Sequence, residues 1–226
     1  MNFHALTRAR TFAMTSTVLV TGFEPFDGRD LNPSWEAVVR LAETWSGPLH
    51  TARLPCVFGA AIPTLQTAIE VYAPDLVVCV GQAGGRHTIT PERVAINVDD
   101  ARIPDNAGNQ PVDVPVVADG PAAYFTRLPV KACVAELRSA GIPATVSQSA
   151  GTFVCNHVFY GLMHLIATRY PGLRGGFVHV PYAPEQVVDG TGPSMSIDMI
   201  SRGLAIMLRT SLSTPVDVLL SDGALS

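Results

Sequence analysis

The residue best placed for chemistry is a cysteine that follows a glycine-containing turn and precedes an apolar helical pattern. Cys155 lies in the run Ser149-Ala-Gly-Thr-Phe-Val-Cys-Asn-His157, where a loop is expected to become a helix. Backbone N–H groups at a helix start favour the thiolate, which is the reactive form of cysteine. A free cysteine is more often a small buried hydrophobe, and the other three fit that description: Cys56, Cys79 and Cys133.

A reactive thiol needs a base, and the chain has six histidines. His157 lies two positions beyond Cys155 on the same predicted helix, so the two side chains diverge. His179 stands near the end of the apolar run Phe177-Val-His-Val180, where a histidine is often simply a core residue. However, the end of the strand that carries His179 is expected at the face where the Cys155 loop emerges, so we prefer His179 as the base. His87, in a loop after another predicted strand, stays open.

A third group should orient the imidazole, and a carboxylate or amide suits that role. Glu92 stands in the run Ile89–Asn97 at the entry to a predicted strand. Its ordinary interpretation is a solvated surface glutamate paired with Arg93. The pattern alone does not separate it from three nearby aspartates: Asp99, Asp100 and Asp105.

Two loops could bind a ligand. The run Thr21-Gly-Phe-Glu-Pro-Phe-Asp-Gly28 places two phenylalanines in a loop, which indicates either a core staple or an apolar pocket for a flat, neutral group. The run Gly81-Gln-Ala-Gly-Gly85 is neither GxGxxG nor a P-loop, so a phosphate site is weakly supported. Its glycines also permit a tight turn or a close backbone approach to a small ligand.

Short apolar runs alternate with helical patterns along the chain, and this alternation predicts an α/β fold with an open, largely parallel central sheet. Chemistry in such sheets gathers at the carboxyl ends of the strands. The candidate loops follow strands expected to end near 22, 81, 148 and 180. Asn32 and Pro33 are suited to the cap and first position of a helix. The expected strands are 17–22, 49–55, 75–80, 93–98, 144–148 and 177–180. The expected helices are 33–45, 62–72, 130–137, 155–170 and 194–212. The polar stretch 99–121 is expected to be a long functional loop.

Composition narrows the function classes. The chain has 226 residues, of which 47% are hydrophobic, and a formal net charge of −4. This indicates one globular domain, 17–226, after a loose extension, 1–16. No basic stripe or long apolar run is present, which argues against nucleic-acid and membrane partners. No Cys/His spacing resembles a zinc site, so neither metal nor cofactor is expected. Free cysteines and the absence of a signal-peptide pattern favour the cytoplasm.

Four segments together resemble the pyroglutamyl peptidase I (pyrrolidone-carboxylate peptidase) family in order and spacing, over about residues 17–210. They are Thr21–Phe26, Gly81–Arg86 with Ile89–Asn97, Gly151–His157 and Gly176–Pro181. The resemblance implies a three-layer α/β/α sandwich and a cysteine omega-peptidase. Its substrates are pyroglutamyl peptides, from which it removes the N-terminal pyroglutamate. It also implies no metal and a homo-oligomer, a tetramer or a dimer.

The resemblance implies a Cys155–His179–Glu92 triad of nucleophile, general base and orienting carboxylate. Further family positions fall on an arginine near the oxyanion region, two aromatic residues around the pyrrolidone ring and a pocket glutamine: Arg102, Phe23, Phe26 and Gln82. The chain departs from the family in about a dozen additional N-terminal residues and in Cys56, where threonine is frequent. The alternatives are a nucleoside-phosphorylase-like α/β enzyme that uses the 81–85 turn, and a non-catalytic small-ligand-binding module.

Overall fold

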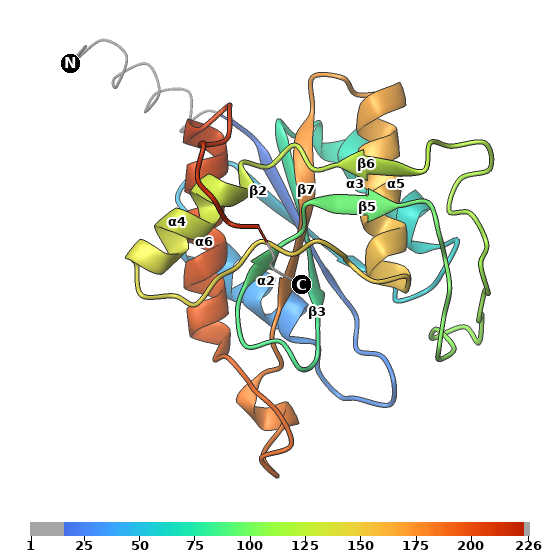
Figure 1. The fold of residues 1–226 in the computed structure, drawn as a ribbon, viewed down its shortest axis with the longest axis horizontal. Coiled ribbons are helices and arrows are strands. Elements are labelled where there is room, and N and C mark those ends of the chain that lie inside the picture. Colours follow the sequence, from blue (N-terminus) through green and yellow to red (C-terminus); the bar gives the residue numbers. More distant parts are fainter. Residues whose placement is uncertain (1–15, 224–226) are drawn as a thin grey trace.

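A five-stranded sheet forms the centre of the molecule in the computed structural model, which describes residues 16–223 (Figure 1). The strand order is β2-β1-β3-β7-β4. Neighbouring strands are parallel except for β4, which runs antiparallel to β7. The strands are β1 (Val18–Phe23), β2 (Leu49–Leu54), β3 (Leu76–Gln82), β4 (Thr90–Pro91) and β7 (Arg174–Val180). The predicted α/β fold with a largely parallel sheet is therefore confirmed.

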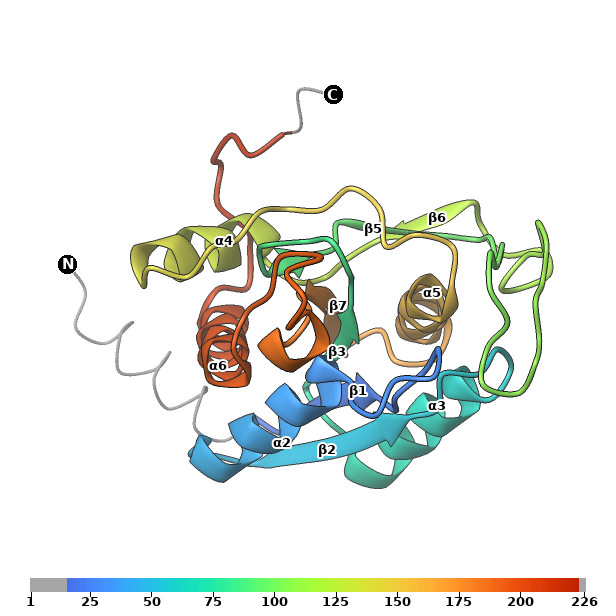
Figure 2. The ribbon, with the colours of Figure 1, turned by 90° about the horizontal axis from the view of Figure 1, so that it is seen from below.

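Helices cover both faces of this sheet, which makes three layers (Figure 2). The helices are α2 (Pro33–Thr44), α3 (Ala61–Tyr72), α4 (Val130–Ser139), α5 (Val154–Thr168) and α6 (Ile197–Ser213). Successive strand side chains point to opposite faces. Val18 and Val20 accordingly pack with α2, α4 and α6, whereas Leu19 packs with α3 and α5. Each face of the sheet therefore has its own apolar core.

Local chemistry fixes where the helices begin. Asn32 Oδ1 accepts a hydrogen bond from the Ser34 N–H at 3.1 Å, and Pro33 occupies the first helical position of α2, as predicted. Pro129 precedes α4 and offers no side-chain acceptor. Asp217, in the C-terminal tail, caps this helix instead, because its two carboxylate oxygens accept hydrogen bonds from the N–H groups of Lys131 and Ala132.

The predicted strand 93–98 exists as the shorter β5 (Val94–Ile96). It pairs with β6 (Ala123–Phe125) in a separate two-stranded sheet. The chain between β5 and β6 is the long loop that the sequence predicted, and it lies at the right-hand edge of the molecule, on the outer side of α5 (Figure 1).

The predicted strand 144–148 is wrong. The segment runs parallel to 89–92 but joins it only through two isolated bridges, Ile89 with Ala144 and Glu92 with Ser147. A regular ladder cannot form because β4 is only two residues long and Pro91 has no N–H to donate. The segment nevertheless delivers the loop before α5 to the carboxyl edge of β3 and β7.

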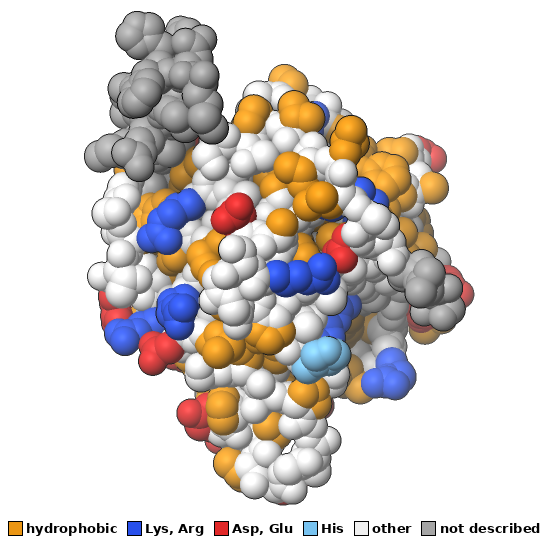
Figure 3. All heavy atoms as spheres, turned by 60° about the vertical axis from the view of Figure 1, so that its left-hand side comes forward, with side chains coloured by type: hydrophobic (Ala, Val, Ile, Leu, Met, Phe, Trp, Pro, Cys, Tyr) orange, Lys and Arg blue, Asp and Glu red, His pale blue; other side chains and the backbone are white. Residues whose placement is uncertain are grey.

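The molecular face over α4 and α6 carries basic and acidic side chains side by side, without a patch of one sign (Figure 3). Within residues 16–223, no helix is long and apolar enough to cross a membrane. Residues 1–15 of the expected N-terminal extension lie outside the described part of the chain. Ser16, the last residue of that expected extension, is buried.

Candidate active site

Cys155 is the second residue of α5, and its thiol lies over the backbone of β3. A Cβ atom built on Gly81 would be only 2.8 Å from the Cys155 Sγ, well inside an ordinary contact. The sulfur therefore occupies the space that a side chain at Gly81 would need. Phe177 closes the other side of this space, since its ring would be 2.7 Å from the same Cβ.

His179 is the cross-strand neighbour of Gly81 in the parallel pair β3–β7. Paired residues on neighbouring strands point to the same face, so the His179 imidazole and the Cys155 thiol lie on the same side of the sheet. The His179 Nδ1 is 2.7 Å from the Glu92 Oε1. Because a carboxylate only accepts, Nδ1 carries the proton and Nε2 is left as the basic nitrogen.

Glu92 follows β4, where its N–H donates to the Phe177 carbonyl at 2.9 Å. This bond fixes the glutamate beside β7, and its carboxylate is fully buried. The same Oε1 that contacts His179 also accepts from the Arg86 Nη1 at 2.7 Å. The structure thus brings Arg86, Glu92 and His179 into one chain of contacts, although His179 lies 87 residues after Glu92.

The rival residues are engaged elsewhere. His157 Nδ1 lies 2.7 Å from the Asp99 Oδ2, and its Nε2 accepts from the Gly59 N–H at 3.4 Å. Asp105 accepts hydrogen bonds from loop amides, including the Phe58 N–H. His87 is exposed. His157 and Asp99 therefore satisfy each other and hold α5 to the long loop.

Burial has the largest effect on the pKa values of Cys155 and His179. Burial raises the pKa of the Cys155 thiol well above its usual value, and the neighbouring Cys56 and Glu92 groups act in the same direction. It also lowers the pKa of His179, although the bond to Glu92 opposes this shift. Burial therefore outweighs the helix-start effect expected from the sequence. Both shifts favour the neutral forms of the thiol and the imidazole at neutral pH.

The other cysteines behave as the sequence predicted. Cys56, Cys79 and Cys133 are free and buried, and desolvation raises the pKa of each thiol to about 12. Thiols that stay protonated at neutral pH are poor nucleophiles. Cys155 differs from them because part of its surface remains exposed and because it lies beside the imidazole of the next strand.

An aromatic cluster lies beside the start of the helix that carries Cys155. The half-buried Phe26 ring lies 6.1 Å from the Phe153 ring, and Phe58 meets Phe153 edge-on at 5.3 Å. Phe23 is only 2% exposed and packs against Phe177 at 6.3 Å, so it forms the base of this region. Sequence reasoning missed Phe153 and Phe58. The position of Phe153, two residues before the candidate nucleophile, was the signal available.

Gln82, at the end of β3, faces a second glutamine. Its Oε1 accepts from the Gln186 Nε2 at 2.9 Å. Gln186 is held in this orientation because its Oε1 accepts from the Ala183 N–H and its Nε2 also donates to the Leu31 carbonyl. The amide NH₂ of Gln82 makes no hydrogen bond within residues 16–223, so it can donate to a ligand. No pattern in the sequence pointed to Gln186.

Arg102 is exposed and makes no hydrogen bond or ion pair to any residue of the described chain. The structure does not bring it into contact with Cys155, so its role near the oxyanion stays a prediction.

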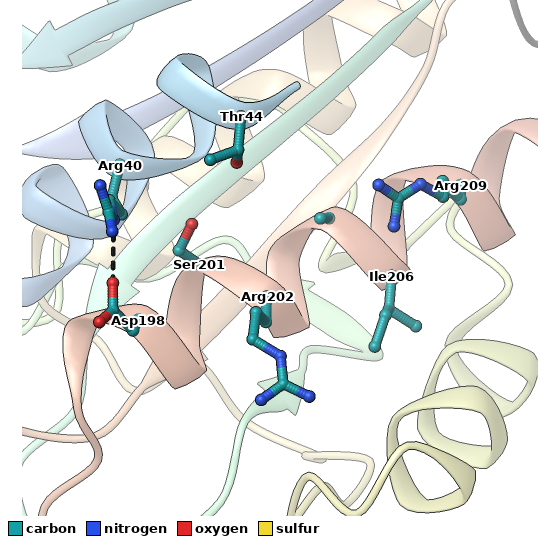
Figure 4. Close-up of a pocket in the computed structure, with 8 residues that line it drawn as sticks. Arg40, Thr44, Asp198, Ser201, Arg202, Ile206 and Arg209 are labelled. Carbon is teal, nitrogen blue, oxygen red and sulfur yellow. Dashed lines mark hydrogen bonds and ion pairs between the residues drawn. The ribbon is translucent and has the colours of Figure 1, made fainter. Parts of the chain in front are cut away.

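A separate hollow of about 520 Å³ lies between α2 and α6, away from these residues (Figure 4). Arg40 from α2 faces Asp198 from α6 there, at 2.9 Å, and also pairs with Glu43. Its cation is thus already matched by acids. The part of the chain that the structure describes holds no group of three or more His, Cys, Asp or Glu side chains arranged to bind a metal ion.

A thiol, an imidazole–carboxylate pair and an aromatic cluster lie at the carboxyl edge of a largely parallel α/β sheet, and this combination is typical of the class of α/β cysteine hydrolases. A model of the pyroglutamyl peptidase family matches residues 16–214. The chain belongs to this family.

Relatives and solved structures agree with this assignment. The pyrrolidone-carboxylate peptidase of Streptomyces coelicolor is 60% identical over 211 residues, covering 92% of this chain and 98% of the relative. That of Bacillus subtilis is 54% identical over 214 residues, covering 94% and 100%. The crystal structure of pyroglutamyl peptidase I from Bacillus amyloliquefaciens superposes with a TM-score of 0.89 at 51% identity, covering 92% of this chain and 100% of that one.

Proposed function

We propose that this chain is a cysteine omega-peptidase that hydrolyses the amide bond after an N-terminal pyroglutamyl residue. The observation that carries the proposal is the meeting of three groups on one face of the sheet. The Cys155 thiol lies over Gly81, His179 stands on the adjacent strand, and Glu92 holds its Nδ1 at 2.7 Å. The family relationship supports the same reaction.

The first half of the reaction forms a thioester. His179 Nε2 takes the proton from Cys155, and the sulfur attacks the carbonyl carbon that links pyroglutamate to the next residue. A helix leaves its first N–H groups without intrahelical partners, so the amides at the start of α5 can stabilise the oxyanion. One such donor contributes about 3 kcal/mol. We place Arg102 in the same region as a further donor.

The second half returns the enzyme to its starting state. The protonated His179 gives its proton to the departing amine, and the peptide leaves with a free N-terminus. Water then gives a proton to His179 and attacks the thioester carbonyl, and the proton finally returns to the Cys155 sulfur. Glu92 stabilises the transient imidazolium and keeps Nδ1–H directed at itself throughout.

The pocket suits a neutral lactam. Phe26 and Phe153 offer ring surface to a flat five-membered ring, with the buried Phe23 beneath them. The Gln82 amide NH₂ is the donor that a lactam carbonyl requires. A pyroglutamyl group has no free α-amine, so this site needs no carboxylate to bind an ammonium.

Cys155→Ser tests the proposal directly. We expect it to abolish release of a fluorophore from a pyroglutamyl conjugate, while Cys133→Ser, on the opposite face of the sheet, remains active. Iodoacetamide should inactivate the unmodified enzyme. Full activity of Cys155→Ser would refute the assignment. Phosphate-dependent cleavage of a nucleoside, indifferent to alkylation, would favour a phosphorylase. Tight pyroglutamate binding without turnover would favour a binding module.

We further propose that the enzyme acts in the cytoplasm as a homotetramer. The four free thiols suit a reducing compartment. The tetramer rests on the family resemblance, with a dimer as its alternative. Light scattering on the purified protein tests it, because a tetramer has four times the 24.0 kDa mass of the chain.

A further inference from the structure

Arg86 carries the cation that faces the buried carboxylate of the active site. Glu92 is fully buried, and its Oε1 accepts from both the Arg86 Nη1 and the His179 Nδ1, each at 2.7 Å. A carboxylate without water around it stays ionised only when a positive charge or several donors compensate it. His179 does not supply that charge, because burial lowers its pKa and leaves it neutral.

The Arg86 guanidinium is itself held in a fixed orientation. Its Nη1 also donates to the Thr90 Oγ1 at 2.6 Å, and its Nη2 donates to the Ser149 carbonyl at 3.0 Å. Thr90 belongs to β4, and Ser149 lies in the loop that leads to the Cys155 helix. One side chain therefore ties the carboxylate to both the strand before it and the loop before the nucleophile. The planar fork of arginine suits such a multiple contact better than lysine does.

We propose that Arg86 is a positioning residue that holds the Glu92 carboxylate in place, so that His179 presents Nε2 to the Cys155 thiol. Arg86 contacts the Glu92 carboxylate directly, and its positive charge also acts on His179 and Cys155. The inference rests on the proposed function, since it assigns Arg86 a part in that reaction.

This role predicts a specific kinetic signature. Activity requires a neutral His179. Removal of Arg86 takes away a positive charge that lowers the pKa of His179. The pKa of His179 therefore rises, and the acid limb of the pH profile moves to higher pH. The Cys155 thiol from α5 lies on the same face of the sheet as the imidazole, and the Thr90 hydroxyl of β4 donates to the His179 backbone carbonyl.

The test compares Arg86→Gln, Arg86→Lys and a matched control, Arg40→Gln. Arg40 is also doubly ion-paired, but on the surface between α2 and α6. We expect Arg86→Gln to lower kcat about 10- to 100-fold, with KM within about twofold and the acid limb moved upward by at least half a pH unit. Arg86→Lys should restore the position of the limb but only part of kcat, and Arg40→Gln should match the unmodified enzyme. The folded fraction comes from circular dichroism and the reactive fraction from titration of the thiol.

A role confined to folding predicts a lower melting temperature and a smaller reactive fraction, without a moved acid limb. An Arg86→Gln profile that superposes on that of the unmodified enzyme, with kcat per reactive site within about twofold, overturns the proposal. If Arg86→Gln does not fold, Arg86→Lys decides the question, because wild-type kcat in that variant overturns the positioning role. Failure of the proposed function itself looks different, since the unmodified enzyme would then not cleave the pyroglutamyl conjugate at all.

Discussion

Gly81→Ala should disable the enzyme by displacing its nucleophile. The added Cβ would lie 2.7 Å from the Phe177 ring and 2.8 Å from the Cys155 Sγ. Ordinary contacts between carbon atoms are about 3.5–4.0 Å, so the thiol and the ring must move apart by roughly 1 Å. Crowding of this kind destabilises a core by about 1–3 kcal/mol. A misplacement of 1 Å costs about a hundredfold in rate, or about 2.7 kcal/mol in the barrier.

The assay combines turnover of a pyroglutamyl conjugate, the rate of alkylation by iodoacetamide and the melting temperature. Two glycine variants serve as controls. Gly176→Ala crowds Thr126 and Leu128 on the opposite face of β7, so it should destabilise the fold without moving the thiol. Gly172→Ala meets nothing within 4 Å and should be silent. Folded Gly81→Ala protein with activity and alkylation within about threefold of the unmodified enzyme would show that the thiol does not occupy this space.

Three other outcomes follow from the structure. The acid limb of kcat/KM should lie below the usual histidine pKa of 6.5, because burial lowers the pKa of His179 and the imidazole stays neutral in more acidic solution. A pH–rate profile checks this, and an acid limb above 6.5 contradicts it. Phe26→Ala should raise KM about tenfold with a smaller effect on kcat. Phe125→Ala, which changes a side chain that is 72% exposed, should alter neither constant, and steady-state kinetics distinguishes the two variants. Asp217→Ala should lower the free energy of unfolding by about 1 kcal/mol and leave kcat unchanged, because α4 loses its N-terminal cap. An unchanged denaturation midpoint argues against this capping role.

Much of the fold follows from local patterns. The alternation of apolar runs and helical periods predicts the central strands, and Asn32 with Pro33 marks the start of α2 within a residue. The strand predicted at 144–148 failed because its partner is interrupted by Pro91, and pairing depends on both strands. No local pattern reveals that a neighbouring segment cannot continue a ladder.

The site was less accessible from local patterns because its contacts are tertiary. Cys155 could be chosen for its position, but its pKa depends on burial that the helix start does not reveal. The sequence left His157 and Asp99 as candidates, and only the fold pairs them with each other. Arg86 stood in a glycine-rich run that suggested a turn, and nothing local linked it to Glu92, six residues later.

The strand order has a consequence for the time at which the enzyme becomes active during synthesis. β7 lies between β3 and β4, yet it is the last strand to leave the ribosome. Until it arrives, β3 keeps an open edge, and Glu92 lacks the Phe177 carbonyl that holds it in place. The proposed nucleophile, Cys155, is thus synthesised before its proposed base, His179. On that proposal, insertion of β7 between β3 and β4 both closes the exposed edge and completes the catalytic triad.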